Sequence, residues 1–399
     1  MTDHETGHET GHETGHVDFV VAGLGALGSA TCHELARRGH RVVGLERFEL
    51  GHARGASHDT SRILRHSYHT PAYVRLTQQA YADWARLEGD SGEDLVTVVG
   101  GLDLFPPGAA ISPVDYTTSL DAVGIDHEVL DPSDVARRWP QFRLPEGTLV
   151  LHQPDAAIVP AGRGTRVLQE QARRRGADLR EQTPVTAVRD LGAGGLEVGT
   201  TGGVVRCERL VVCADAWTND VLAGLGVQVP LEVTLEQVTY FRPERPDDFA
   251  PGRLPLWIWM DDPSYYGFPC FGEPTVKAAQ DCGGPVVDPD HRTSSRDPVM
   301  EGRLARHVRS LLPASGAPVR SLRCQYTLTP DRDFVLSAVP GHPSVVVGMG
   351  AAHGFKFAPT FGRLLADLAV DGRTSTDLTP FRMDRPGLTD PAYRAHWLV

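Results

Sequence analysis

The stretch Val17-Asp-Phe-Val-Val-Ala-Gly23-Leu-Gly25-Ala-Leu-Gly28, near the start of this 399-residue chain, decides its fold. An apolar run that ends in a glycine-rich turn predicts a buried strand. The sequence predicts a helix from Ser29 to Arg38 next, and Gly39 ends it. Residues 41–46, Arg-Val-Val-Gly-Leu-Glu, predict a second strand that closes on an acidic residue. The stretch therefore predicts a β-α-β unit about thirty residues long.

The spacing of Gly23, Gly25 and Gly28 is the glycine pattern of Rossmann-type dinucleotide binding. Glycines let the backbone approach a pyrophosphate, and the free N–H groups of the helix that follows can bind it. Glu46 stands where an acceptor for ribose hydroxyls is expected, and its charge would repel a 2′-phosphate. The motif therefore disfavours NADP but leaves NAD and FAD open.

The rest of the chain divides into Rossmann-like and β-rich parts. Helices are predicted over 73–87, 161–175, 217–222, 297–312 and about 359–370, and strands over 183–188, 210–213 and 344–348. Residues 229–277 are strand-rich, which indicates an inserted domain. We expect a two-domain α/β fold with a discontinuous Rossmann-type domain (17–95, 150–222 and 321–385), a β-rich substrate domain (96–149 and 223–320) and a C-terminal tail (386–399).

Composition excludes several classes of function. The formal charge is −12 and no basic stripe is present, which argues against a nucleic-acid partner. No apolar run reaches the roughly 18 residues of a membrane span, and no secretory signal is visible. The six cysteines are scattered without a CxxC pair, which favours a cytoplasmic chain with reduced thiols.

Three copies of His-Glu-Thr-Gly run from His4 to Gly15 and are followed by His16. Histidines four apart would share a helix face and could capture a metal. The glycine in every repeat and the lack of apolar residues favour instead a disordered extension over 1–16. We therefore expect order to begin at Val17 and predict no metal site.

Five motifs follow one another along the chain in a characteristic order. They are the glycine motif, the run Ser57-His58-Asp59-Thr60-Ser61-Arg62-Ile63-Leu64-Arg65-His66, Tyr265-Tyr266-Gly267-Phe268-Pro269 with Lys277, Arg323-Cys324-Gln325-Tyr326-Thr327 before Thr329-Pro330-Asp331, and His353-Gly354-Phe355-Lys356-Phe357. Together they resemble the monomeric sarcosine oxidase and N-methyltryptophan oxidase family of D-amino-acid-oxidase-like FAD enzymes, from Val17 to about Arg385. The resemblance implies FAD as cofactor, a glutathione-reductase-like two-domain fold, and a monomer that acts on a small amino acid and O2.

The resemblance implies that Cys324 is bonded through sulfur to the 8α carbon of the flavin. Such a bond requires a thiolate, and the neighbouring Arg323 is a type of group that favours one. Taken alone, Cys324 would be read as a buried free cysteine. The other residues expected at the cofactor are Gly23, Gly25, Gly28, Glu46, Arg47, Ser57, Val185, Gly350, His353, Gly354 and Lys356.

The loop Gly350–Phe355 precedes the last predicted helix, where free amides would stabilise negative charge on the reduced flavin. Ala352 stands where the family usually has glycine. Alanine costs little there unless its φ angle is positive, so we expect a small effect.

The resemblance assigns Arg65 and Lys356 to the substrate carboxylate, for which the planar arginine fork is suited. Arg62 would lie near the flavin edge and His58 beside the flavin, while Tyr266 would hydrogen-bond substrate. Arg62 and Arg65 would share a face if their segment is helical. Without the family motif, the two arginines and Lys356 would be read as surface charges.

Lys277 resembles the lysine that contacts flavin N5 through water and promotes reaction with O2, where a cation stabilises superoxide. Four residues later, Asp281 replaces the histidine of sarcosine oxidase, which argues against sarcosine itself as the best substrate. Asp215 replaces a usual glycine, and the sequence does not explain it. Trp257 and Trp259 share a strand face that is either core or pocket wall.

The function implied is that of an FAD-dependent oxidase acting on the C–N bond of a secondary, N-methylated amino acid. Oxidation gives an imine, which water hydrolyses to an aldehyde and an amine. O2 is reduced to H2O2. Two alternatives remain open: a cyclic imino-acid oxidase or a dehydrogenase on the same fold, and a flavin-bound protein without catalysis.

Overall fold

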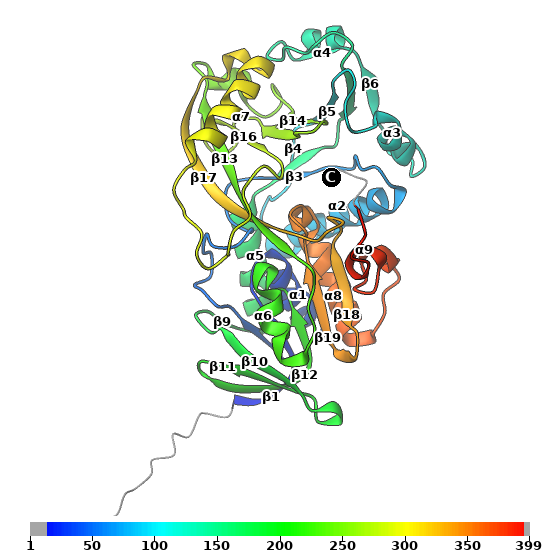
Figure 1. Ribbon diagram of the computed structural model, residues 1–399, viewed down its shortest axis with the longest axis vertical. Helices are drawn as coiled ribbons and strands as arrows, with labels where there is room; N and C mark the ends of the chain where they lie inside the picture. The colour runs from blue at the N-terminus through cyan, green and yellow to red at the C-terminus, as the bar shows by residue number, and fades with distance from the viewer. Residues whose placement is uncertain (1–13, 395–399) are drawn as a thin grey trace, which may run out of the picture.

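The computed structural model describes residues 14–394, which form two large sheets placed one above the other along the longest axis (Figure 1). The predicted β-α-β unit is confirmed as β1 (Thr14–Ala22), α1 (Ala26–Arg37) and β2 (Val42–Leu45). It opens the lower sheet, where β1 pairs in parallel with β2 on one side and β12 on the other.

The lower sheet has a parallel centre of five strands in the order β19-β12-β1-β2-β9. An antiparallel hairpin continues it, and β18 pairs with β19. The other strands are β9 (Asp178–Arg180), β10 (Val185–Asp190), β11 (Leu196–Thr200), β12 (Gly203–Val212), β18 (Val335–Val339) and β19 (His342–Met349).

The first strand begins earlier than the sequence predicts. We expected order from Val17, but Thr14 already pairs with Val205 of β12, with an irregular register between Thr14 and Val17. A neighbouring strand supplies backbone partners here, so strand pairing extends beyond the apolar run. The rest of the expected extension, residues 1–13, lies outside the described residues.

Five helices accompany the lower sheet close to where they were predicted, four in contact with its strands and α2 packed outside them. Helix α1 packs against both α5 (Ala161–Arg174) and α8 (Ala358–Asp371), and α2 (Pro71–Ser91) packs on α8. Helix α6 (Thr218–Leu222) contacts β10 instead. The glycine motif at the start of α1 and the loop before α8 are thereby held at the same end of the sheet.

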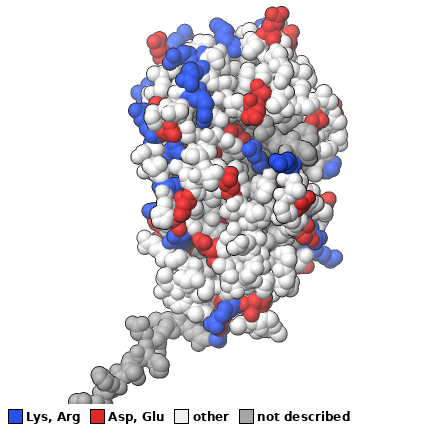
Figure 2. Space-filling model, in the orientation of Figure 1, with Lys and Arg blue, Asp and Glu red and all other residues white. Residues whose placement is uncertain are grey.

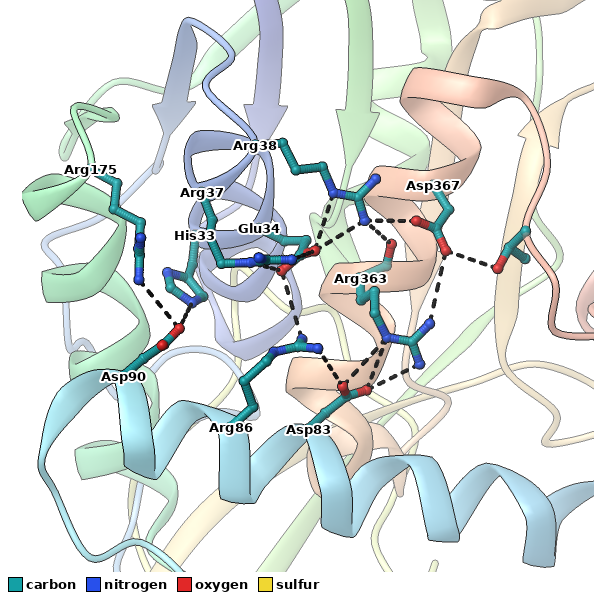
Figure 3. Close-up of polar contacts among 11 residues, drawn as sticks. His33, Glu34, Arg37, Arg38, Asp83, Arg86, Asp90, Arg175, Arg363 and Asp367 are labelled. Carbon is teal, nitrogen blue, oxygen red and sulfur yellow. Dashed lines mark hydrogen bonds and ion pairs between the residues drawn. The ribbon is translucent and has the colours of Figure 1, made fainter.

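Ion pairs between charged side chains join three of these helices (Figure 3). Arg38, directly after α1, is 3.0 Å from Glu34 of α1 and 2.6 Å from Asp367 of α8. Arg363 of α8 in turn lies 3.1 Å from Asp83 of α2. Such a network fixes α8, and with it the loop at its N-terminus, relative to α1.

The upper sheet is the expected β-rich part, in the order β17-β13-β16-β15-β14-β5-β7-β6. Two of its strands, β7 and β17, begin in the ranges expected for the substrate domain and extend into those expected for the Rossmann-type domain. The bounds are β5 (Gly101–Phe105), β6 (Glu128–Leu130), β7 (Leu149–Gln153), β13 (Glu232–Arg242), β14 (Leu256–Trp259), β15 (Tyr265–Phe268), β16 (Val276–Gln280) and β17 (Ala317–Leu328). Helices α3 (Pro113–Asp121), α4 (Pro132–Arg138) and α7 (Pro298–Leu311) accompany this sheet.

A small third sheet lies at mid-height, where the two halves meet (Figure 1). It consists of β3 (Arg62–Leu64), β8 (Ala157–Val159) and β4 (Thr97–Val98). At the C-terminal end, α9 (Pro386–Thr389) lies in the expected tail, and Leu388 packs against the core of the lower sheet.

No helix within residues 14–394 is both long and apolar enough to cross a membrane. On the face shown in Figure 2, acidic and basic side chains are intermixed, with a gathering of basic ones over the region of α7 and β17.

Candidate active site

A large cavity of about 970 Å³ opens where β1 and β2 end, the usual ligand position in a Rossmann-type sheet. Gly23, with a φ of 90°, and Gly25 both line it. Gly28 does not line it, but a Cβ atom there would collide with the carbonyl oxygen of Gly23. The first two glycines thus form the wall, while Gly28 permits the close approach of α1 to the turn.

Glu46 lies at the end of β2 and lines the same cavity. It accepts hydrogen bonds from the N–H groups of Leu24 (2.8 Å) and Phe48 (3.0 Å). Burial raises the pKa of Glu46, but the His52 contact and these bonds outweigh it, so the pKa lies below its ordinary value. A fixed, ionised carboxylate at this place suits the ribose hydroxyls of a dinucleotide.

Most residues expected at the cofactor line this cavity, and three, Gly28, His353 and Lys356, do not. His353 and Lys356 line a neighbouring cavity instead. Those found in the large cavity besides Gly23, Gly25 and Glu46 are Arg47, Ser57, Val185, Cys324, Gly350 and Gly354.

The loop before α8 is more strained than expected. Ala351 and Ala352 have φ angles of 39° and 73°, which L-residues adopt at a cost. Our expectation that Ala352 replaces glycine at little cost is therefore wrong, because it depended on a negative φ. Gly354 donates its N–H to Gly350 O (2.7 Å), which closes the loop tightly beside the large cavity.

Arg62 and Arg65 do not share a helix face, because Arg62 begins strand β3. The Arg62 guanidinium donates to the carbonyl oxygens of Ala56 (2.8 Å) and His58 (2.9 Å), so it shapes the loop before it. The Nε2 atom of His58 is buried without a partner, although the residue lines the large cavity. Burial, reinforced by Arg62, lowers the pKa of His58 to about 4, so the imidazole is neutral.

A second cavity of about 120 Å³ adjoins the first. Its volume suits a compact ligand, well below the range of drug-sized pockets. The two cavities share a set of lining residues, so a cofactor in the first would contact a ligand in the second; these are His58, Asp59, Arg62, Cys324, Tyr326, Ala352 and Phe355.

Two cations with the expected role in substrate binding, Arg65 and Lys356, line the small cavity. Lys356 Nζ donates to His353 O (2.8 Å). Burial, together with repulsion from Arg65, lowers the pKa of Lys356 well below its ordinary value. A bound anion would offset the repulsion between the two cations, so their arrangement is chemically suited to a carboxylate.

Sequence reasoning missed the partner of Arg65. Asp103 of β5 accepts from Arg65 Nη1 at 2.7 Å, and the two side chains are only 4% and 8% exposed. Asp103 lies behind Arg65, outside the residues that line the cavity. The sequence did contain a sign of this partner, because an aspartate between two leucines in a fully buried strand requires a compensating charge or hydrogen bond.

Lys277 is buried, and its ammonium group is 2.7 Å from Asp59 and 2.9 Å from Ser61 O. Lys277 itself lines neither cavity. Asp59 lines both cavities and separates Lys277 from them, and it has a φ angle of 83°. Burial lowers the pKa of Lys277 to about 8 against the attraction of Asp59. Asp59, also bonded by the Tyr240 hydroxyl, is a second residue that sequence reasoning overlooked.

Cys324 lines both cavities, but Arg323 is not the group that acts on it. Neighbours on a strand face opposite sides, and Arg323 donates to Leu235 O (2.9 Å) across β13. Burial raises the pKa of Cys324 to about 11, while Arg62 and Lys277 lower it. Our expectation about Arg323 is therefore wrong, and Arg62 takes its place.

Aromatic residues of β14 and β15 divide between core and cavity. Tyr266 lines the small cavity as expected, with its hydroxyl 3.3 Å from that of Tyr326. Trp257 is fully buried in the core of the upper sheet, and Trp259 packs against the same core. The tryptophans share a face, but it is not the pocket wall; Ile258, on the opposite face, lines the cavity.

Asp215, unexplained by the sequence, has a φ of 49° and lines the large cavity, where it accepts from Gln325 Nε2 (3.4 Å). Burial raises the pKa of Asp215.

A nucleotide cavity joined to a small cationic cavity defines the class: an oxidoreductase that places a dinucleotide cofactor beside a small anionic substrate. The cavity residues fit FAD through the glycine turn, the Glu46 carboxylate and the unpaired Nε2 of His58. Residues 18–368 match the family described as FAD dependent oxidoreductase (DAO), and the chain belongs to this family.

The names of proteins with similar sequences agree with this family assignment. The chain is 34% identical to monomeric sarcosine oxidase of Streptomyces avermitilis, an alignment that covers 94% of this chain and 97% of the relative. It is 29% identical to N-methyl-L-tryptophan oxidase of Escherichia coli, over 92% and 99% of the two chains. Among solved structures it is similar to NikD, an unusual amino acid oxidase essential for nikkomycin biosynthesis, with a TM-score of 0.82, 30% identity, and 92% and 98% coverage.

Proposed function

We propose that the protein is an FAD-dependent oxidase of the C–N bond of a small secondary amino acid, in the first place an N-methylated one. The observation that carries this proposal is the position of Arg65 and Lys356 in a cavity of about 120 Å³ that adjoins the dinucleotide cavity. The names of the relatives, sarcosine oxidase and N-methyl-L-tryptophan oxidase, support the same class of substrate.

Arg65 and Lys356 bind the substrate carboxylate. Asp103 and Ser67 both accept from Nη1 of Arg65, which orients the guanidinium and leaves its other N–H groups for a ligand. Lys356 contributes a second, point-like charge. Tyr266 supplies a hydroxyl for a hydrogen bond to substrate, and apolar side chains such as Ile258 and Met260 enclose the remainder.

FAD held in the large cavity would supply the two-electron chemistry by which the C–N bond is oxidised and O2 is reduced. For an N-methyl amino acid the balance is amino acid plus O2 and water to the demethylated amino acid, formaldehyde and H2O2. Arg62 and His58 form the wall between the cavities, where they orient the reacting groups. Lys277 forms an ion pair with Asp59, which separates it from the cavities. The positive charge of Lys277 stabilises the negative charge that forms on O2.

Cys324 is the proposed point of covalent attachment of FAD through its sulfur. It lines both cavities, as an attachment point must; burial raises the pKa of its thiol to about 11, and the charges of Arg62 and Lys277 act against that rise. The amides of the Gly350–Phe355 loop are proposed to stabilise negative charge on the reduced ring. We further propose a monomer in the cytoplasm; the six unpaired cysteines support a reducing compartment, and the name of one relative supports the monomer.

A substrate screen tests the proposal. Purified holoenzyme is offered N-methyl amino acids and cyclic imino acids, and peroxide is measured; each is paired with the same amine lacking its carboxylate. We expect peroxide from one or more amino acids and none from the matched amines. Faster turnover of cyclic imino acids would redefine the substrate, and equal turnover of amines without a carboxylate would reject the roles of Arg65 and Lys356.

A further inference from the structure

The small cavity contains an acidic side chain that the proposed reaction does not use. Asp281 directly follows β16 and lines the cavity together with Arg65 and Lys356. Its N–H donates to Ser264 O (2.9 Å), which fixes the backbone against the end of β15. Because side chains alternate along a strand, Asp281 projects to the same face as Lys277, four residues earlier.

The carboxylate of Asp281 differs from the other acids of the site. Asp59 and Asp103 are engaged in ion pairs of 2.7 Å with Lys277 and Arg65. Within residues 14–394, by contrast, no basic side chain approaches Asp281 closely enough for an ion pair. Its hydrogen-bond partner is the adjacent Cys282 thiol, and burial raises the pKa of Asp281.

Three cations surround Asp281 at longer range: Arg332, Lys356 and Arg65. Two of them are the proposed ligands of the substrate carboxylate. The cavity therefore combines a cationic anchor with one acidic group that accepts a hydrogen bond from the Cys282 thiol but has no ion-pair partner within residues 14–394. This combination matches a zwitterion, whose carboxylate and ammonium groups are separated by a single carbon.

We propose that Asp281 binds the ammonium group of a zwitterionic amino-acid substrate while Arg65 and Lys356 bind its carboxylate. The inference rests on the proposed function and narrows its substrate class to amino acids that arrive with a positively charged nitrogen. A secondary amine is protonated near neutral pH, and a cation entering beside Arg62, Arg65 and Lys356 requires a compensating negative charge. Asp281 is thus a specificity-determining residue.

Two ligands of the same shape test the role of charge alone. Trimethylglycine has a quaternary nitrogen without a lone pair and cannot be oxidised, whereas 3,3-dimethylbutanoate has carbon in place of that nitrogen. Each is titrated into holoenzyme, and the flavin absorbance reports binding. We expect wild type to bind trimethylglycine at least about tenfold more tightly, because its quaternary nitrogen is attracted to the Asp281 carboxylate by charge without a hydrogen bond.

The variant Asp281→Asn should lose this preference by weakening the binding of trimethylglycine about tenfold or more, because the coulombic attraction to the quaternary nitrogen is removed. It should leave 3,3-dimethylbutanoate unchanged or bound more tightly, because a negative charge has been removed. Asp281→Glu should retain part of the preference, and Asp371→Asn, an exposed position at the end of α8, should retain all of it.

Equal binding of the two ligands by wild type would overturn the inference, even if Asp281→Asn does not fold. A parallel loss of both ligands in Asp281→Asn would also overturn it, since the carboxylate site would then have been disturbed. If wild type binds neither ligand, the proposed function fails together with the inference. If 3,3-dimethylbutanoate alone binds, only the inference fails.

Discussion

Replacing Arg65 by methionine should have two separable consequences, one for the fold and one for binding. In the wild type, Arg65 Nη1 and Asp103 Oδ1 are 2.7 Å apart, and both side chains are buried. Arg65→Met leaves the Asp103 carboxylate buried without its cation. Breaking a buried pair in this way lowers the free energy of unfolding by about 3–5 kcal/mol.

The double variant Arg65→Met/Asp103→Leu removes both charges and should recover most of this stability, because apolar replacements of buried pairs are commonly neutral or stabilising. Carboxylate binding should not recover. Loss of one charge-assisted contact costs about 1.5–3 kcal/mol, which corresponds to about a 10- to 150-fold weaker affinity. The single and double variants should therefore differ in stability and agree in affinity.

Urea unfolding measures the stability of the three proteins, and titration of the holoenzymes with a thioether carboxylate, followed by flavin absorbance, measures affinity. A double variant that binds the inhibitor as tightly as wild type would refute the assignment of Arg65, and Arg62 would be the next candidate. Unchanged stability of Arg65→Met would refute the energetic role of the ion pair with Asp103.

Four further predictions concern the flavin attachment, Lys277 and the loop before α8. Acid-precipitated wild-type holoprotein should retain its flavin colour and Cys324→Ala should release it; free FAD from the wild type would refute attachment. Lys277→Met should slow reoxidation of the reduced flavin by O2 far more than its reduction by substrate, and stopped-flow mixing of each half-reaction decides this. Because the cationic form of Lys277 predominates below its pKa of about 8, wild-type reoxidation should also slow as the pH rises through that value, and a flat profile would contradict the role. Ala352→Gly should raise the free energy of unfolding by about 1 kcal/mol, because glycine adopts a φ of 73° without the cost to alanine; a lower urea midpoint would show that the strain is absent.

The cofactor half of the molecule could be predicted from sequence because its requirements are local. A Cβ atom at Gly23 or Gly28 would collide with nearby backbone atoms, so both positions require glycine. The turn that they form joins a strand and a helix that are consecutive in the chain. Glu46 follows from the length of that unit. Long helices such as α2 and α5 were predicted because apolar periodicity is strong over many residues.

The substrate half depended on contacts between distant segments. The pair of Arg65 with Asp103 joins the region after β3 to the middle of β5, and that of Lys277 with Asp59 spans more than half the chain. Strand β3 is three residues long, too short for a periodicity that would have separated it from a helix. The opposite orientation of Arg323 and Cys324 could have been predicted, since strand neighbours always diverge.

The measurement that tests the central claim most directly is the stoichiometry of the reaction with the best N-methyl amino acid from the screen. O2 consumption, H2O2 and formaldehyde are measured together in one sample of holoenzyme. The account predicts one H2O2 and one formaldehyde for each O2 consumed. Substrate-dependent reduction of the flavin without O2 consumption would contradict the assignment as an oxidase, and the absence of any flavin reduction by secondary amino acids would contradict the assignment of the substrate.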